Sequence, residues 1–365
     1  MWKNFFNSRK NIIFTGIFIG ISAAYLQKLG NPPNMGICVA CMLRDIAGAL
    51  GLHRAEVAQY IRPEIIGFIL GSLLAALIFK EFKPRAGSAP LVRFVLGFLS
   101  MVGALVFLGC PWRTLLRLAG GDGNALFGLA GLIVGIWIGI FFIKSGYNLG
   151  RNQRTHQLVG WIMPVIMLGI FLLLIFQPHL SSGAVFFSSK GPGAQHAPIF
   201  ISLIIAIAIG FLAQRTRFCT VAAVRDAILI KDTYLLTGVV SLLLAALVSN
   251  LTLKQFHPGF QGQPIAHNSQ LWNFGGMVLA GLAFTLAGGC PGRQLFLSGE
   301  GDADAAIFVL GMVVGAGFAH NFATASSPKG PGLWGPASVI TGLIVCFIIG
   351  FSMSDLGKKQ MGDKK

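Results

Sequence analysis

The residues best suited to chemistry are four cysteines that stand in two kinds of repeated sequence block. Cys38 and Cys219 open the similar stretches CVACMLRDIAGAL and CTVAAVRDAIL. Cys110 and Cys290 each stand in a Gly-Cys-Pro-x-Arg block. Thiols are soft, polarisable and weakly hydrogen-bonding groups. A path lined by them therefore favours a soft anion with terminal sulfur or selenium over a sugar or an ammonium ion.

The Gly-Cys-Pro-x-Arg blocks predict two helix N-termini. Proline is favoured at the first helical position, where it loses no hydrogen bond. Cys110 and Cys290 would then face free backbone N–H groups and the positive end of the helix dipole, which together can hold an anion. The alternative is that each thiol is only a small buried apolar group. Because the block occurs twice, we favour the functional interpretation, with these supporting residues: Pro111, Pro291, Arg113 and Arg293.

The blocks form an internal repeat with an offset of about 180 residues. Arg-Asp pairs recur at the same offset, as Arg44-Asp45 and Arg225-Asp226. Charges inside a membrane are costly and tend to pair. Adjacent residues of a helix do not face each other, so we expect each of these charges to find its partner elsewhere. Direct contact with a substrate is the alternative role.

Composition indicates a membrane protein. Of the 365 residues, 54% are hydrophobic and 11% are charged, and the mean hydropathy is +0.73. This is too little charge to cover a soluble protein of that length. We predict an all-α polytopic membrane protein, because lipid requires segments that satisfy their own backbone. About ten transmembrane helices are expected, the first as a retained span rather than a cleaved signal peptide: Ile12–Gln27, Ile65–Phe79, Phe94–Cys110, Gly123–Ile143, Val159–Phe176, Ala197–Gln214, Thr233–Leu253, Leu271–Cys290, Ala305–Ala319 and Pro336–Ser354.

Two further apolar stretches, Met35–Leu52 and Phe218–Ile230, are too short or too charged to be spans. Such segments are tolerated at membrane depth only inside protein or beside a polar cavity, so we expect short re-entrant helices. Each half of the chain holds an odd number of spans, so the second half must enter from the opposite face. We predict a single membrane domain over 1–365 with two inverted-topology repeats, 11–176 and 191–356. Such repeats place a substrate site where broken helices meet, which indicates transport.

The basic residues indicate orientation and exclude one class of partner. The net charge is +16 at pH 7, and the Lys and Arg residues lie mainly in short loops, where they set topology and attract anionic lipid headgroups. With the amino terminus in the cytoplasm, most of them fall on the inner side. We expect a multi-pass protein of the cell inner membrane with both termini cytoplasmic. Because the bilayer explains the charge, no nucleic acid partner is expected.

The other cysteines and the histidines predict neither a cofactor nor a metal site. Cys38 and Cys41 form a Cys-x-x-Cys pair with no second such pair, and the 7 histidines are scattered. Cys41 aligns with an alanine and Cys346 has no counterpart, so neither is expected to be required. The strings SSKGPG and SSPKGPG are either turns or parts of an outer vestibule in which Lys190 and Lys329 attract anions.

The twin Gly-Cys-Pro-x-Arg blocks, each preceded by a short Cys-containing helix, resemble the YeeE/YedE family of membrane transporters. The resemblance covers roughly residues 10 to 355. It implies an inverted repeat of long and short helices, and uptake of thiosulfate through a path lined with cysteines. By motif, it carries that role onto Cys110 and Cys290, and by position onto Cys38 and Cys219. The length and the Arg-Asp repeats resemble the YedE branch, which is associated with selenium metabolism.

The expected function is import of a small sulfur- or selenium-containing anion, with a soluble cytoplasmic sulfur or selenium carrier protein as a further partner. No P-loop motif is visible, so uptake would be secondary, channel-like or driven by a partner that consumes the substrate. Two alternatives stay open. One is a membrane thiol oxidoreductase, which would need paired cysteines such as Cys38 and Cys41. The other is an accessory membrane subunit of selenium or sulfur metabolism.

Overall fold

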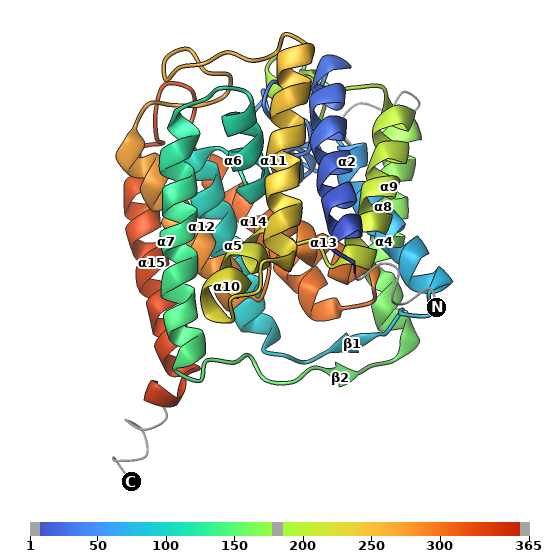
Figure 1. The fold of residues 1–365 in the computed structure, drawn as a ribbon, viewed down its shortest axis with the longest axis vertical. Coiled ribbons are helices and arrows are strands. Elements are labelled where there is room, and N and C mark those ends of the chain that lie inside the picture. Colours follow the sequence, from blue (N-terminus) through green and yellow to red (C-terminus); the bar gives the residue numbers. More distant parts are fainter. Residues whose placement is uncertain (1–7, 177–184, 358–365) are drawn as a thin grey trace.

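The computed structural model describes residues 8–176 and 185–357. Within them the chain forms a bundle of long and short helices with two short strands (Figure 1). The long helices are α2 (Arg9–Lys28), α4 (Pro63–Ile78), α5 (Pro90–Phe107), α7 (Asn124–Lys144), α8 (Gln157–Phe176), α9 (Ile199–Thr216), α11 (Tyr234–Thr252), α12 (Gln270–Leu286), α14 (Ala303–Asn321) and α15 (Gly335–Ser352). The short ones are α3 (Val39–Ala49), α6 (Pro111–Ala119), α10 (Thr220–Leu229), α13 (Pro291–Gly299) and the 3₁₀ turn η2 (Pro192–Ala194).

The long helices match the predicted spans, because each span overlaps one of them. Among the described residues, 8 helical stretches are long and apolar enough to cross a membrane, some of them joining a long helix to the short helix that follows. Helix α4 is apolar but has only 16 residues, and α2 is less apolar than the others. The prediction of an all-α polytopic membrane protein is confirmed.

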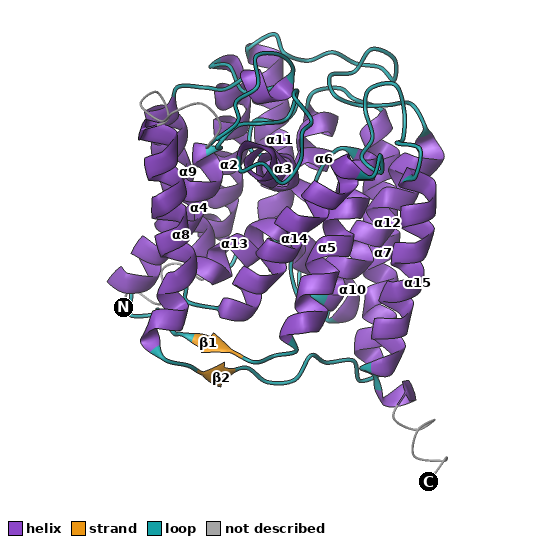
Figure 2. Ribbon diagram, turned by 180° about the vertical axis from the view of Figure 1, so that it is seen from behind, coloured by secondary structure: helices purple, strands orange, loops and turns teal. Residues whose placement is uncertain are grey.

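The bundle has two ends that differ in their connections (Figure 2). We name the strand end after β1 (Arg85–Ala86) and β2 (Gln153–Arg154), an antiparallel pair. The loop end carries the long connections 50–62 and 253–269. Helix α2 begins and α15 ends at the strand end (Figure 1). The terminal segments on which the prediction of cytoplasmic termini falls lie outside the described residues.

Long helices from the two halves of the chain pack side by side. Helix α5 packs along α14 and α12, α7 along α12, α4 along α9, and α2 along α11. The α5–α14 contact requires glycine, because a Cβ at Gly97 would clash with the carbonyl oxygen of Phe308, and one at Gly311 with that of Phe94. Small residues let membrane helices approach this closely. The two halves are therefore interleaved along their length.

The short helices lie two toward each end of the bundle, and they include the predicted re-entrant segments. Helices α3 and α6 lie toward the loop end, where the amide of His257 donates to the carbonyl of Gly120 at 2.9 Å. Helices α10 and α13 lie toward the strand end, where the amide of Lys83 donates to the carbonyl of Glu300 at 2.9 Å. Since the residue before each short helix is buried, the free N–H groups of these helices face the protein interior.

Candidate functional site

The structure brings the repeated cysteines together in two pairs, one toward each end of the bundle. The loop-end pair consists of Cys38, which caps α3, and Cys110, which caps α6. Their sulfur atoms lie 3.8 Å apart, within reach of an S–H···S contact. The Cys38 sulfur also accepts a hydrogen bond from the amide of Cys41 at 3.4 Å. Both side chains are buried, at 0% and 1% exposure.

The strand-end pair repeats this arrangement with Cys219 and Cys290. Cys219 caps α10, and its sulfur accepts hydrogen bonds from the amides of Ala222 at 3.4 Å and Cys290 at 3.3 Å. Cys290 caps α13, and its sulfur accepts from the amide of Arg293 at 3.5 Å. Both cysteines are buried. Each pair therefore stands where the N-termini of two short helices meet.

This geometry has the features that can hold an anion. The N-terminus of a helix presents unpaired N–H groups and a partial positive charge, and each pair combines two such ends. The four thiols are free, with no disulfide among them. The predicted helix N-termini at Cys110 and Cys290 are confirmed. Cys38 and Cys219 cap helices too, which was not predicted although each directly precedes an apolar helical run.

Arg113 stands behind the loop-end pair as a buried guanidinium without a carboxylate among its recorded partners. Its Nε donates to the carbonyl of Asn34 at 3.1 Å, and one terminal nitrogen donates to that of Ile265 at 3.2 Å. The other donates to the carbonyl of Leu108 and to the sulfur of Cys41, the latter at 3.4 Å. Carbonyls satisfy the hydrogen bonds of an arginine but leave its charge in place. The loop-end site is therefore electropositive.

Arg293 occupies the same position of the repeat at the strand end, but its charge is compensated. One of its terminal nitrogens lies 3.3 Å from a carboxylate oxygen of Glu300. Glu300 is buried and also lies within salt-bridge distance of Arg217, at 3.4 Å, and of Arg85, at 3.6 Å. Arg217 is half exposed. The strand-end site thus connects through one carboxylate to a basic surface.

The Arg-Asp pairs overturn the expectation that adjacent residues find their partners elsewhere. Arg44 binds the carboxylate of Asp45 at 2.6 Å, and Arg225 binds that of Asp226 at 2.8 Å. The guanidinium is long and flexible enough to fold back along the helix to its neighbour. Asp45 also accepts from Arg62 at 2.8 Å. The first pair is buried and the second is partly exposed, and neither makes a recorded contact with a thiol of the two pairs.

A basic pocket of about 290 Å³ opens at the loop end beside the first thiol pair. Lys28, Lys254 and His257 line it together with Asn34, whose carbonyl accepts from the buried Arg113. Burial lowers the pKa of His53 and His267, in neighbouring loops, so neither carries the positive charge at pH 7. Lysine and arginine supply permanent positive charge at this end. No sequence pattern predicts this pocket, because its residues come from segments far apart in the chain.

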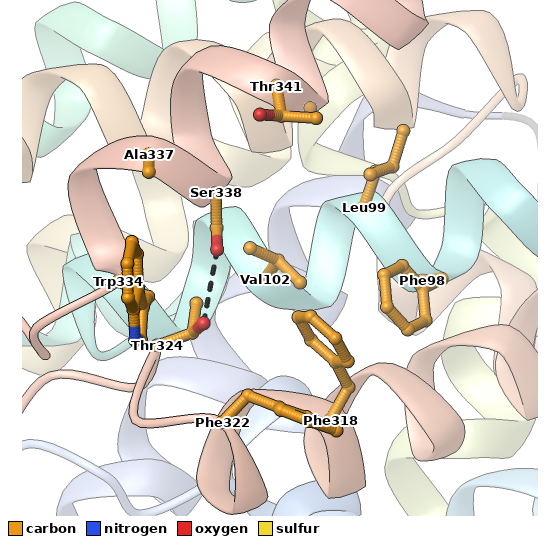
Figure 3. Close-up of a pocket in the computed structure, with 11 residues that line it drawn as sticks. Phe98, Leu99, Val102, Phe318, Phe322, Thr324, Trp334, Ala337, Ser338 and Thr341 are labelled. Carbon is orange, nitrogen blue, oxygen red and sulfur yellow. Dashed lines mark hydrogen bonds between the residues drawn. The ribbon is translucent and has the colours of Figure 1, made fainter.

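A second pocket, of about 400 Å³, is apolar and lies away from both pairs (Figure 3). Helices α5, α14 and α15 line it with Phe98, Phe318 and Trp334, and its hydroxyls from Thr324 and Ser338 bond to each other at 3.1 Å. Its lining contains no cysteine and no charged residue. It therefore lacks the thiols and the positive charge that distinguish the two thiol sites.

The remaining candidates from the sequence do not join the thiol pairs. Lys190 forms an exposed ion pair with Glu56 at 3.3 Å, and Lys329 lies in a separate loop. Cys346 is buried within α15. Cys41 lies next to the loop-end pair and contacts Arg113. No cluster of three metal-ligating side chains occurs in the described part of the chain.

Comparison with known proteins supports this chemistry. Residues 215–345 match a family model described as sulphur transport. A thiosulfate transporter of Spirochaeta thermophila is 32% identical over 108 residues, which cover 28% of this chain and 31% of that protein. The resemblance to the YeeE/YedE family is confirmed. An uncharacterized protein of Methanocaldococcus jannaschii is 29% identical over 94 residues, which cover 22% of this chain and 89% of that protein.

The match to the sulphur-transport model includes the second copy of both repeated blocks. The matched residues contain Cys219 and Cys290 with the helices that they cap. The names of both the family model and the bacterial relative describe transport rather than catalysis. The aligned part spans about a third of the length of the bacterial relative.

Proposed function

We propose that this protein carries a small sulfur-containing anion, with thiosulfate as the first candidate, through a path lined by its two thiol pairs. The observation that carries the proposal is the position of Cys38, Cys110, Cys219 and Cys290, each at the buried N-terminus of a short helix. The oxygens of such an anion suit N–H donors, and its terminal sulfur suits a thiol. The name of the bacterial relative agrees with this substrate class.

The charges along the path give the anion an entry and an exit. Lys28 and Lys254 would attract it to the basic pocket, and Arg113 would draw it toward the loop-end pair. Passage from thiol to thiol needs only S–H···S and S–H···O contacts, so no covalent bond is formed. Beyond the strand-end pair, Glu300 offsets Arg293, which favours release. Uptake would then run from the loop end to the strand end.

This direction fits an inner-membrane protein whose termini are cytoplasmic, and we propose that topology. It also fits the inverted repeat of 11–176 and 191–356, since α2 starts at the strand end and α9 starts at the loop end (Figure 1). A soluble carrier that accepts the sulfur compound would bind at the strand end. Reporter fusions to the carboxyl terminus test the orientation, because a signal from the periplasm would reverse the assignment.

Selenium species are the second candidate substrate. Selenium is softer than sulfur and would use the same thiols and N–H donors. The length and the Arg-Asp repeats of the YedE-like branch motivate this choice. Competition of labelled thiosulfate uptake by selenite and related selenium anions decides which substrate is preferred.

The experiment that tests the function is uptake of labelled thiosulfate by cells that carry single cysteine variants at matched membrane abundance. Cys110→Ser and Cys290→Ser keep the size and a hydroxyl but lose the soft sulfur, so we expect each to lower uptake about tenfold, the effect of about 1.4 kcal/mol. Cys346→Ala, remote from both pairs, is the control and should transport normally.

The same variants separate transport from thiol oxidoreductase chemistry. The 3.8 Å contact between Cys38 and Cys110 makes an electron-carrying dithiol the main rival. A thiol oxidoreductase would need both cysteines of this dithiol. It would not need Cys290. Full uptake by Cys290→Ser, with loss by Cys110→Ser, would overturn the proposed path and favour the dithiol.

A further inference from the structure

The space between the two thiol pairs contains the buried side chain of Trp112. This residue is two positions after Cys110, in the first turn of α6, and its exposure is 1%. A Cβ built on Gly292 would lie 3.1 Å from Cζ2 of the indole. Gly292 is two positions after Cys290, in the first turn of α13. The ring therefore reaches from one Cys-Pro helix to the start of the other.

Three other aromatic rings enclose this indole. The centroids of Phe68 and Phe218 each lie 5.8 Å from that of Trp112, and the centroid of Phe296 lies 6.2 Å away. Phe218 directly precedes Cys219, so the aromatic rings around Trp112 extend to the strand-end pair. Phe68 and Phe218 meet the indole edge to face and Phe296 is tilted against it, so the apolar rings fill the space around the buried indole. An anion cannot pass from one pair to the other along these helix ends while the indole keeps this position.

The indole N–H has no hydrogen-bond partner, although it is buried. Tryptophan can only donate at this atom, and leaving a buried donor unpaired is destabilising. The rings of Phe68, Phe218 and Phe296 offer at most a weak N–H···π contact in place of a hydrogen bond to an oxygen or nitrogen. An oxyanion arriving from the neighbouring thiol pair would satisfy it at once. The unpaired donor therefore points to a ligand that is bound only in passing.

The two repeated blocks differ at the position that carries the indole, which leaves room for a single ring. The equivalent positions of the two Gly-Cys-Pro blocks carry Trp112 and Gly292. A second indole at 292 would occupy the space that the first one fills, because even a methyl group there meets Cζ2 at 3.1 Å. The internal symmetry is broken at the point where the two halves meet.

We propose that Trp112 is the gate between the two thiol pairs, and that its indole N–H binds the anion while the ring moves aside. The identity of that anion rests on the proposed function, but the barrier does not. The gate explains how buried thiols at both ends can form one path without leaving an open pore.

Site-resolved thiol labelling tests the gate without any substrate. A membrane-impermeant thiol reagent is applied to right-side-out and to inside-out vesicles, and modification of each cysteine is read by peptide mass spectrometry. In Trp112→Ala we expect Cys219 and Cys290 to be labelled from the loop end at least about tenfold faster than in the unmodified protein. Trp137→Ala, which removes an exposed indole from α7, is the matched control and should leave labelling unchanged.

A second variant separates the N–H from the bulk of the ring. Trp112→Phe keeps an aromatic barrier but loses the donor, so labelling should stay one-sided while uptake of thiosulfate falls about tenfold. The gate is wrong if neither Trp112→Ala nor Trp112→Leu admits the reagent to Cys219 or Cys290 from the loop end. It is also wrong if Trp112→Phe transports at the normal rate. If the unmodified protein transports no thiosulfate, the proposed function fails. The labelling experiment still tests whether Trp112 blocks access from one thiol pair to the other.

Discussion

The two thiol sites share their helix geometry and differ in their charge. At the loop end, Arg113 bonds to carbonyls and to a thiol, so its charge is not offset by a recorded acidic neighbour. At the strand end, Arg293 meets Glu300. The position of the first repeat that corresponds to Glu300 is Gly120, which has no side chain. One substitution within a repeated block thus makes one site electropositive and the other close to neutral.

This difference teaches how a repeated motif can support directional transport. An anion is drawn more strongly to the site whose arginine is uncompensated, and it leaves more easily from the site whose arginine is paired. The basic pocket with Lys28 and Lys254 lies beside the first site. At the second site, the half-exposed Arg217 shares Glu300 with Arg293.

Removing the uncompensated charge should have the largest effect. Arg113→Gln leaves hydrogen-bonding capacity but deletes the positive charge behind Cys38 and Cys110. A hydrogen bond to a charged group is worth about 1.5–3 kcal/mol, so uptake should fall roughly tenfold to a hundredfold. The measurement is initial uptake rate in proteoliposomes, with thermal unfolding in detergent as the check on folding. If Arg113→Gln and Arg293→Gln lose activity equally, the contrast between the sites is wrong.

Glu300→Gln should make the strand-end site resemble the loop-end site. The variant removes the charge that offsets Arg293, so the anion would bind more tightly there and leave more slowly. We expect kcat to fall about three- to tenfold and KM to fall as well, because an anion that binds more tightly is released more slowly. An unchanged KM with a lower kcat would mean that Glu300 acts only on stability.

The basic pocket should have the smallest effect. Replacing Lys28 and Lys254 together with Gln lowers the attraction of the anion but leaves the path intact. We expect KM to rise about two- to fivefold at low ionic strength and the difference to shrink in 0.5 M salt, because exposed charges are screened. Lys190→Gln, whose lysine pairs with Glu56 elsewhere on the surface, is the matched control. Equal effects from both variants would show that only the overall charge matters.

Much of the fold could be predicted from the sequence because lipid imposes strong constraints. Apolar length located the long helices, and the Gly-Cys-Pro-x-Arg blocks located the N-termini at Cys110 and Cys290. The Arg44-Asp45 expectation was wrong, because helix spacing describes where side chains start and not how far a guanidinium can fold back. Spacing also gave no information on distances between segments.

The contacts between distant segments of the site could therefore not be predicted from the sequence. The meeting of Cys38 with Cys110 depends on two helices that are 72 residues apart in sequence at these positions. The compensation of Arg293 depends on Glu300, whose role has no counterpart in the first repeat. Trp112 differs from Gly292 at one position of an aligned block, and only packing shows that the indole fills the space beside that glycine.

The central claim is that the two thiol pairs form a path for a soft anion. The most direct test is to compare labelled thiosulfate with labelled sulfate in proteoliposomes of the purified protein, since sulfate has the same charge but lacks a terminal sulfur. We predict that thiosulfate enters at least about tenfold faster, and that the double variant Cys110→Ser/Cys290→Ser loses this preference. Equal rates for the two anions in the unmodified protein, or a preference that survives in the double variant, would contradict the claim.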